Sequence, residues 1–120
     1  MLEQTSNAEA VAGLAVFATE LNGRVGSLWQ VLAAAAQGDA DLSAAYADLQ
    51  ERIRADFVKV VQVLQTRSGL RTDLDTEEMA ETLLVLTSPH QHELLVVQAG
   101  WTQERYRVWL GRMLSEAVLA

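Results

Sequence analysis

The chain has 120 residues, half of them hydrophobic, with one proline and no cysteine. Its 9 basic and 16 acidic residues give a formal net charge of −7, which disfavours nonspecific binding to nucleic acid because that binding depends on basic side chains. The lack of cysteine excludes disulfides and thiolate metal sites and fits a reducing, cytoplasmic location. No strand-like alternation and no membrane-length apolar stretch is present, so we expect one soluble, all-α domain over residues 1–120.

The first predicted helical block begins at a capping box formed by Ser6 and Glu9. Apolar residues then recur at spacings of three and four, as on one helix face: Val11, Leu14, Ala18, Leu21, Val25, Leu28 and Leu32. Gly23 and Gly26 interrupt this block, each at a cost of about 1 kcal/mol relative to alanine. We therefore expect either one kinked helix or two helices that meet near Asn22.

The second predicted helix runs from Leu42 to Gln65, after a cap at Asp39 or Asp41. Its apolar face repeats with the helical period: Leu42, Tyr46, Leu49, Ile53, Phe57, Val60 and Leu64. A loop over residues 70–75 follows, and Thr76 is predicted to cap a third helix. That third helix is apolar over more than one stripe, so we expect it to be covered on two sides.

Two helix boundaries are encoded close together near the end of the chain. Ser88, Pro89 and Gln91 form the start of a short helix, which Gly100 is expected to end. Thr102 is predicted to cap the final helix. The apolar stripe of that helix is large enough to need a partner surface: Tyr106, Trp109, Leu110, Met113, Leu114, Ala117 and Val118.

The order and spacing of these segments resemble the C-terminal regulatory domain of TetR-family transcriptional repressors. The resemblance covers roughly residues 66–119 and is carried by Ser68–Ala80, Leu83–Pro89, Gly100–Tyr106 and Trp109-Leu110. Two earlier segments, Arg24–Ala36 and Leu49–Phe57, are similar to the middle helices of such proteins.

The resemblance implies a bacterial, cytoplasmic regulator whose domain is an antiparallel bundle of about five to six helices. It implies a homodimer held by the last two long helices, Thr76–Thr87 and Thr102–Leu119, as an intermolecular four-helix bundle. The expected interface residues are Leu83, Leu86, Tyr106, Trp109, Leu110, Met113, Leu114 and Val118. Trp101 is expected to anchor the junction before the last helix. Replacing Trp109 with aspartate should give a monomer, because a buried unpaired charge enters a symmetric interface twice.

The resemblance also implies a pocket for a small, mostly apolar effector of unknown identity. Aromatic and methionine side chains provide adaptable apolar walls, and an arginine provides a polar anchor; the candidates are Trp29, Arg24, Tyr46, Phe57 and Met79. Core packing, or solvent exposure for Arg24, is the alternative explanation of each. Effector binding would release a repressor from DNA, which such proteins bind through an N-terminal helix-turn-helix. That domain is absent from this chain, so a fragment and a naturally short protein are both compatible with the sequence.

Other functions are less well supported by the residues. His90 and His92 point about 200° apart on a helix and cannot share a metal, although His90 with Glu93 is geometrically possible. An acidic cluster over residues 73–81 lacks the ligand spacing of a calcium loop. No nucleophile motif or phosphate-binding loop is present. We therefore expect no metal, cofactor, membrane or catalytic site, and keep two alternatives: a stand-alone helical dimerisation module without a ligand, and a small all-helical enzyme.

Overall fold

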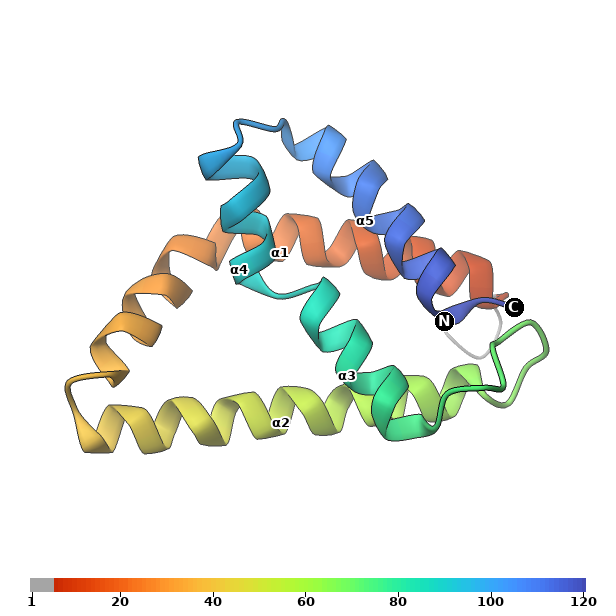
Figure 1. The fold of residues 1–120 in the computed structure, drawn as a ribbon, viewed down its shortest axis with the longest axis horizontal. Helices are drawn as coiled ribbons and strands as arrows, with labels where there is room; N and C mark the ends of the chain where they lie inside the picture. Colours follow the sequence, from red (N-terminus) through yellow and green to blue (C-terminus); the bar gives the residue numbers. More distant parts are fainter. Residues whose placement is uncertain (1–5) are drawn as a thin grey trace.

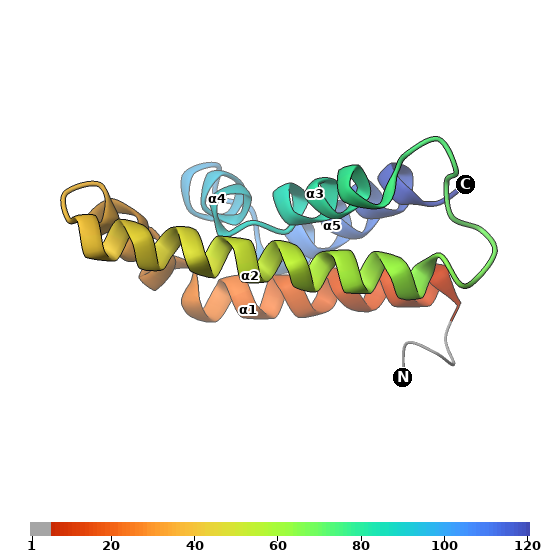
Figure 2. The same cartoon turned by 90° about the horizontal axis from the view of Figure 1, so that it is seen from below.

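The computed structural model describes residues 6–120 and is all-α. Residues 1–5, which precede the first predicted cap, lie outside the described residues. Two long helices form one side of the molecule, and the remaining helices lie across them on the other side (Figures 1 and 2). The elements in chain order are α1 (Asn7–Ala36), α2 (Ala40–Leu64), α3 (Thr76–Leu86), α4 (Pro89–His92), the π-helix η2 (Glu93–Gln98) and α5 (Gln103–Val118). The all-α expectation is confirmed. Within residues 6–120, no helix has the length and hydropathy that crossing a membrane requires.

Helix α1 is one continuous element that changes direction along its length (Figure 1). It begins at the predicted capping box, in which the Ser6 hydroxyl accepts from the Glu9 amide and the Glu9 side chain accepts from the Ser6 amide. Further along, the Thr19 hydroxyl donates to the Ala15 carbonyl at 2.7 Å. A side-chain bond of this kind competes with the helical ladder and favours bending. Of the two possibilities that the sequence left open, the single kinked helix is the one observed.

The buried face of α1 differs from the one that the apolar spacing predicts. Val11 and Ala18 of the predicted apolar face are buried, but Leu21 and Leu28 of the same face are 44% and 68% exposed. The buried residues are smaller and more polar: Asn7, Val11, Ala15, Ala18, Thr19, Asn22, Gly26 and Ala36. Small residues allow α5 to approach closely, since a Cβ on Gly111 would lie only 3.8 Å from the Cβ of Ala15. Close packing against α5 therefore determines which face of α1 is buried.

The helix caps follow local chemistry, with one correction. Asp75, and not Thr76, caps α3, because its carboxylate accepts from the Glu78 amide at 2.8 Å. Thr76 is instead the first residue of α3, and its hydroxyl is hydrogen-bonded to Gln65. The other predicted caps are confirmed: Ser6, Asp39, Ser88 and Thr102.

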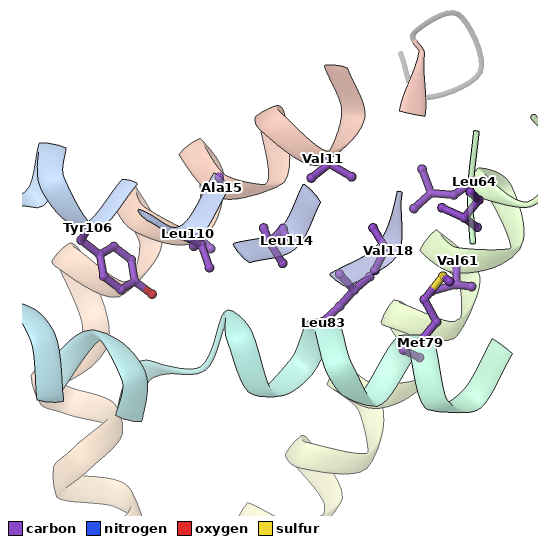
Figure 3. Packing of buried hydrophobic residues seen from close by; sticks show 13 residues of the cluster. Val11, Ala15, Val61, Leu64, Met79, Leu83, Tyr106, Leu110, Leu114 and Val118 are labelled. Carbon is purple, nitrogen blue, oxygen red and sulfur yellow. The ribbon is translucent and has the colours of Figure 1, made fainter. Parts of the chain in front are cut away.

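The core is organised around α5. Its residues Tyr106, Leu110, Leu114 and Val118 are each 0% exposed and recur at every fourth position, so they form one row along the helix. Figure 3 shows this row facing residues from α1, α2 and α3. They are Val11 and Ala15 of α1, Val61 and Leu64 of α2, and Met79 and Leu83 of α3. This single cluster holds both sides of the molecule together.

The end of α5 is fastened to the loop between α2 and α3. Leu70 and Leu119 form an isolated antiparallel bridge. The Arg71 amide donates to the Val118 carbonyl at 2.9 Å, and the Ala120 amide donates to the Gly69 carbonyl at 2.8 Å. Gly69 has a φ of +96°, a conformation that glycine adopts without strain.

Candidate functional site

An open groove of about 590 Å³ lies between α3 and α5. Its apolar lining comes from Val85 and Leu86 of α3 and from Met113 and Ala117 of α5. The polar residues that complete the lining are Glu78, Glu81, Thr82 and Glu116. Val85 is 56% exposed, so an apolar side chain of the groove remains in contact with solvent. The groove therefore combines unburied apolar surface with a local excess of negative charge.

The structure divides the eight residues expected at a dimer interface into two groups. Five of them are 0% exposed and have no surface left to offer a partner copy in this conformation: Leu83, Tyr106, Leu110, Leu114 and Val118. We therefore assign these five to the core of the protomer. Leu86, Trp109 and Met113 are only partly buried. Two of these three, Leu86 and Met113, line the α3–α5 groove.

Aromatic side chains pack together where α5 begins. Trp101 stands edge-on to Trp109, with ring centroids 6.1 Å apart, and the Arg105 guanidinium lies 4.1 Å from the centre of the Trp101 ring. Trp101 therefore packs back over the junction, as predicted. Trp109 also lies 5.9 Å from Tyr106 of the core. An aspartate at position 109 would consequently disturb the protomer as well as any interface.

The five residues expected to line an effector pocket are not brought together. Trp29 and Tyr46 contact each other, with ring centroids 5.6 Å apart. Met79 is fully buried and lies beside Val61 (Figure 3), which is roughly 22 Å from Tyr46 along α2 at ~1.5 Å per residue. The two remaining candidates differ again, because Phe57 packs against the core and Arg24 is exposed. These residues do not surround one shared cavity.

A buried polar cluster lies instead at the bend of α1. Thr19 and Asn22 are each 4% exposed, and His92 of α4 is 6% exposed. The Asn22 amide donates to the Thr87 carbonyl at 2.9 Å, which joins α1 to the end of α3. Gln103 is itself exposed, and its side-chain amide donates to the Thr19 carbonyl at 3.3 Å, which joins α1 to α5 at the edge of the cluster.

The hydrogen bond between His92 and Gln103 indicates which nitrogen of the imidazole is the donor. His92 Nε2 lies 2.5 Å from Gln103 Oε1. An amide oxygen can only accept, so the proton of this bond is on Nε2 of His92. The His92 ring also meets Tyr106 edge-on, with ring centroids 5.0 Å apart. Thr19, Asn22, His92 and Gln103 thus each make at least one side-chain hydrogen bond, whereas one buried atom of the cluster makes none.

That atom is the hydroxyl oxygen of Tyr106. It is buried and has no hydrogen-bond partner among the residues that the structure describes. Burial raises the pKa of Tyr106, and the nearby Asn22 side chain lowers it in part. Asn22 is therefore a neighbour of the hydroxyl, but the geometry does not amount to a hydrogen bond between them. Most buried polar groups in proteins are paired, so this one requires a physical explanation.

The sequence contains signals for this cluster that apolar spacing alone does not reveal. Thr19 and Asn22 follow Val11 and Ala15 at helical spacing, so they extend the true buried face of α1. Gly23 is the second signal. A Cβ there would lie 2.3 Å from Nε2 of Gln103, so the glycine makes room for that side chain.

The acidic side chains that the sequence offers as metal ligands do not gather into one site. Within residues 6–120, no group of three or more potential metal ligands is assembled. Two members of the acidic cluster, Glu77 and Glu81, pair instead with Arg54 of α2, at 3.0 Å and 3.1 Å. These ion pairs join α2 to α3 at the surface, where such pairs contribute little to stability.

Comparison of the chain with protein-family models, curated proteins and solved structures finds no match. Three features remain to indicate a function: the α3–α5 groove, the buried polar cluster, and the helix boundaries of residues 66–119.

Proposed function

We propose that this chain is the effector-sensing and dimerisation domain of a TetR-like transcriptional regulator. In this proposal a second copy covers the α3–α5 groove, and a small apolar ligand releases a repressor from DNA. The DNA would be bound by a separate N-terminal domain. The observation that carries the proposal is the groove itself, because it lies between the two helices to which the resemblance assigns dimerisation.

The chemistry of the groove supports a second copy as its occupant. Leu86 and Met113 are half-buried in the protomer, and Val85 is mostly exposed. A twofold axis would place the same apolar side chains of two copies against each other. Removing that surface from water favours association by about 25 cal/mol per Å² of apolar area. The interface would use the outer sides of α3 and α5, while their inner sides remain in the protomer core.

An aspartate at position 85 tests the proposed dimer. Val85→Asp should fold normally, because Val85 is already 56% exposed in the protomer, and should shift the protein from dimer to monomer in sedimentation velocity. Val31→Asp on α1 is the matched control, since Val31 is 65% exposed and does not line the groove. A dimer that persists in Val85→Asp but dissociates in Val31→Asp would move the interface to α1. A wild-type protein that is monomeric at high concentration would rule out the proposed dimer.

A stand-alone dimerisation module without a ligand is the second candidate. The separation of Met79 from the Trp29–Tyr46 pair favours it, because those residues do not form the expected pocket. Two results would distinguish the candidates. Saturable binding of a small ligand supports the sensing domain, and so does a basic helix-turn-helix encoded directly ahead of residue 1. The absence of both, together with a stable dimer, supports the stand-alone module.

A further inference from the structure

The unpaired hydroxyl of Tyr106 lies in the interior of the molecule. The ring extends from α5 towards the connection between α3 and α4 (Figure 3). That connection contains Thr87, whose carbonyl accepts from Asn22. A phenylalanine would fill almost the same volume without leaving a polar atom unpaired. A buried hydroxyl lowers stability unless another group accepts a hydrogen bond from it.

Gly26 leaves room for a methyl group next to His92. Gly26 is buried in α1, yet a Cβ added there would meet only one heavy atom within 4 Å, Nδ1 of His92 at 3.9 Å. His92 in turn contacts Tyr106. It belongs to a helix of only four residues, which continues directly into the π-helix η2. Short helices and π-helical turns are held by weaker hydrogen-bond ladders than long α-helices, so the ladder of α4 resists displacement less than the ladders of α1, α2 and α5 do.

The polar groups of the cluster define what the site can accept. Its members, Thr19, Asn22, His92, Gln103 and Tyr106, include no carboxylate and no lysine or arginine. Burying an ion beside them would cost too much without a counter-charge. A single neutral oxygen that accepts one hydrogen bond satisfies the Tyr106 hydroxyl.

We propose that this cluster is the polar end of the effector site, where the Tyr106 hydroxyl donates a hydrogen bond to the carbonyl oxygen of a small, neutral, mainly apolar ketone or aldehyde. The proposal rests on the effector-sensing function above and gives that function a place and a ligand chemistry. The ligand enters beside Gly26 by displacing α4 from α1, because the room there in this structure holds only a methyl group. Because α4 connects α3 to α5, this displacement acts on the two helices that border the groove.

A matched pair of probes tests the ligand chemistry. Acetophenone and ethylbenzene have similar size and shape, but only acetophenone carries a carbonyl oxygen. In a Tyr46→Phe background Tyr106 is the only tyrosine, so its labelled ring can be followed by NMR during titration. We expect a saturable change with acetophenone at millimolar concentrations and binding at least roughly tenfold weaker for ethylbenzene. Equal affinity for both probes, or no saturable binding of acetophenone, would overturn the proposal.

Two variants test the site itself. Tyr106→Phe should weaken acetophenone binding at least roughly tenfold and should unfold at the same or a higher temperature than the wild type, since it removes an unpaired polar atom. Gly26→Ala should weaken binding without loss of stability, because its methyl group fills the space beside His92. A clear fall in the unfolding temperature of Tyr106→Phe would mean that the hydroxyl is a structural hydrogen-bonding group, and would refute the proposal. Sedimentation velocity of the same variants shows whether they still dimerise. Loss of ligand binding in a variant that remains a dimer concerns the site alone, whereas a monomeric wild-type protein concerns the proposed dimer.

Discussion

The side-chain amide of Asn7 donates to the main-chain carbonyl of Leu64 at 3.0 Å. This bond joins the first residue of α1 to the last residue of α2, where carbonyl groups have no partner within the helix. The same amide reaches the Ser68 carbonyl at 3.3 Å. Asn7 thus closes the end of α2 from another helix.

Asn7→Ala should therefore destabilise the fold by about 1–3 kcal/mol, because the Ser68 carbonyl loses the Asn7 donor and the Leu64 carbonyl keeps only the Arg67 amide, at 3.2 Å. Urea denaturation followed by circular dichroism measures this loss. Gln62→Ala on the exposed side of α2 is the control and should change stability very little. Equal stability of the two variants would show that the Asn7 bond contributes nothing.

A pair of leucine substitutions tests the assignment of the core. Leu114 is 0% exposed and Leu28 is 68% exposed. Leu114→Ala should cost about 2–5 kcal/mol through lost burial and a cavity, whereas Leu28→Ala should cost well under 1 kcal/mol. Denaturation midpoints of both variants give the comparison. A larger loss of stability in Leu28→Ala than in Leu114→Ala would mean that Leu28 is buried, as the apolar spacing of α1 predicts.

Replacement of the glycines of α1 by alanine should change the stability of the protein differently at each position. Gly26→Ala and Gly13→Ala have room for a methyl group, and each should stabilise the helix by roughly 0.5–1 kcal/mol. In Gly23→Ala the new Cβ would lie 2.3 Å from Nε2 of Gln103, so that side chain must move and its bond to Thr19 is lost. We expect Gly23→Ala to be the least stable of the three in thermal denaturation. A Gly23→Ala protein as stable as Gly13→Ala would contradict the contact.

Alkaline pH should reveal the burial of Tyr106. Burial raises the pKa of Tyr106 above its ordinary value of 10.0, so the folded protein retains the proton longer than the unfolded chain does. The resulting contribution to stability is complete below pH 10.0 and is lost as the pH rises towards the folded-state pKa. In Tyr46→Phe, absorbance at the tyrosinate band should show ionisation only above the ordinary range. Ionisation at the ordinary value would mean that Tyr106 is solvated.

The proposed dimer should become tighter when salt is added. Each protomer carries a formal charge of −7, and three glutamates line the groove. Two copies therefore repel each other electrostatically, and this repulsion is screened as the Debye length falls from about 10 Å at 0.1 M salt to about 3 Å at 1 M. Sedimentation equilibrium over this range should give a falling dissociation constant. A dimer that weakens with salt would indicate that attractive ion pairs hold it instead.

The sequence predicts those features that depend on neighbouring residues. The caps at Ser6, Asp39 and Thr102 each need only one side chain and the amides two or three residues later. Thr76 was the exception because Asp75 precedes it, and a carboxylate is the stronger acceptor for the amides of a helix N-terminus. Helix boundaries are therefore largely a local property of this chain.

The features that depend on distant residues could not be predicted in the same way. Leu21 and Leu28 belong to an apolar repeat, yet α5 packs against the smaller face of α1 that contains Ala15 and Ala18. Which of these two faces of α1 is buried depends on the helix that packs against it, and the local sequence of α1 does not contain that information. The buried polar cluster has the same origin, because Gln103 reaches Thr19 from a distant part of the chain. Tyr46 and Met79 are separated in the same way, because Met79 lies beside Val61, roughly 22 Å from Tyr46 along α2 at ~1.5 Å per residue.

The bridge between Leu70 and Leu119 restricts how α5 can respond to any ligand. With its last turn fastened to the loop before α3, α5 cannot slide along its axis without breaking main-chain hydrogen bonds. Its opposite end, next to η2, has no comparable main-chain tie to α1 or α2 among residues 6–120. Any movement of α5 would therefore be a rotation about its C-terminal end, with the largest displacement at Gln103 and the smallest at Val118.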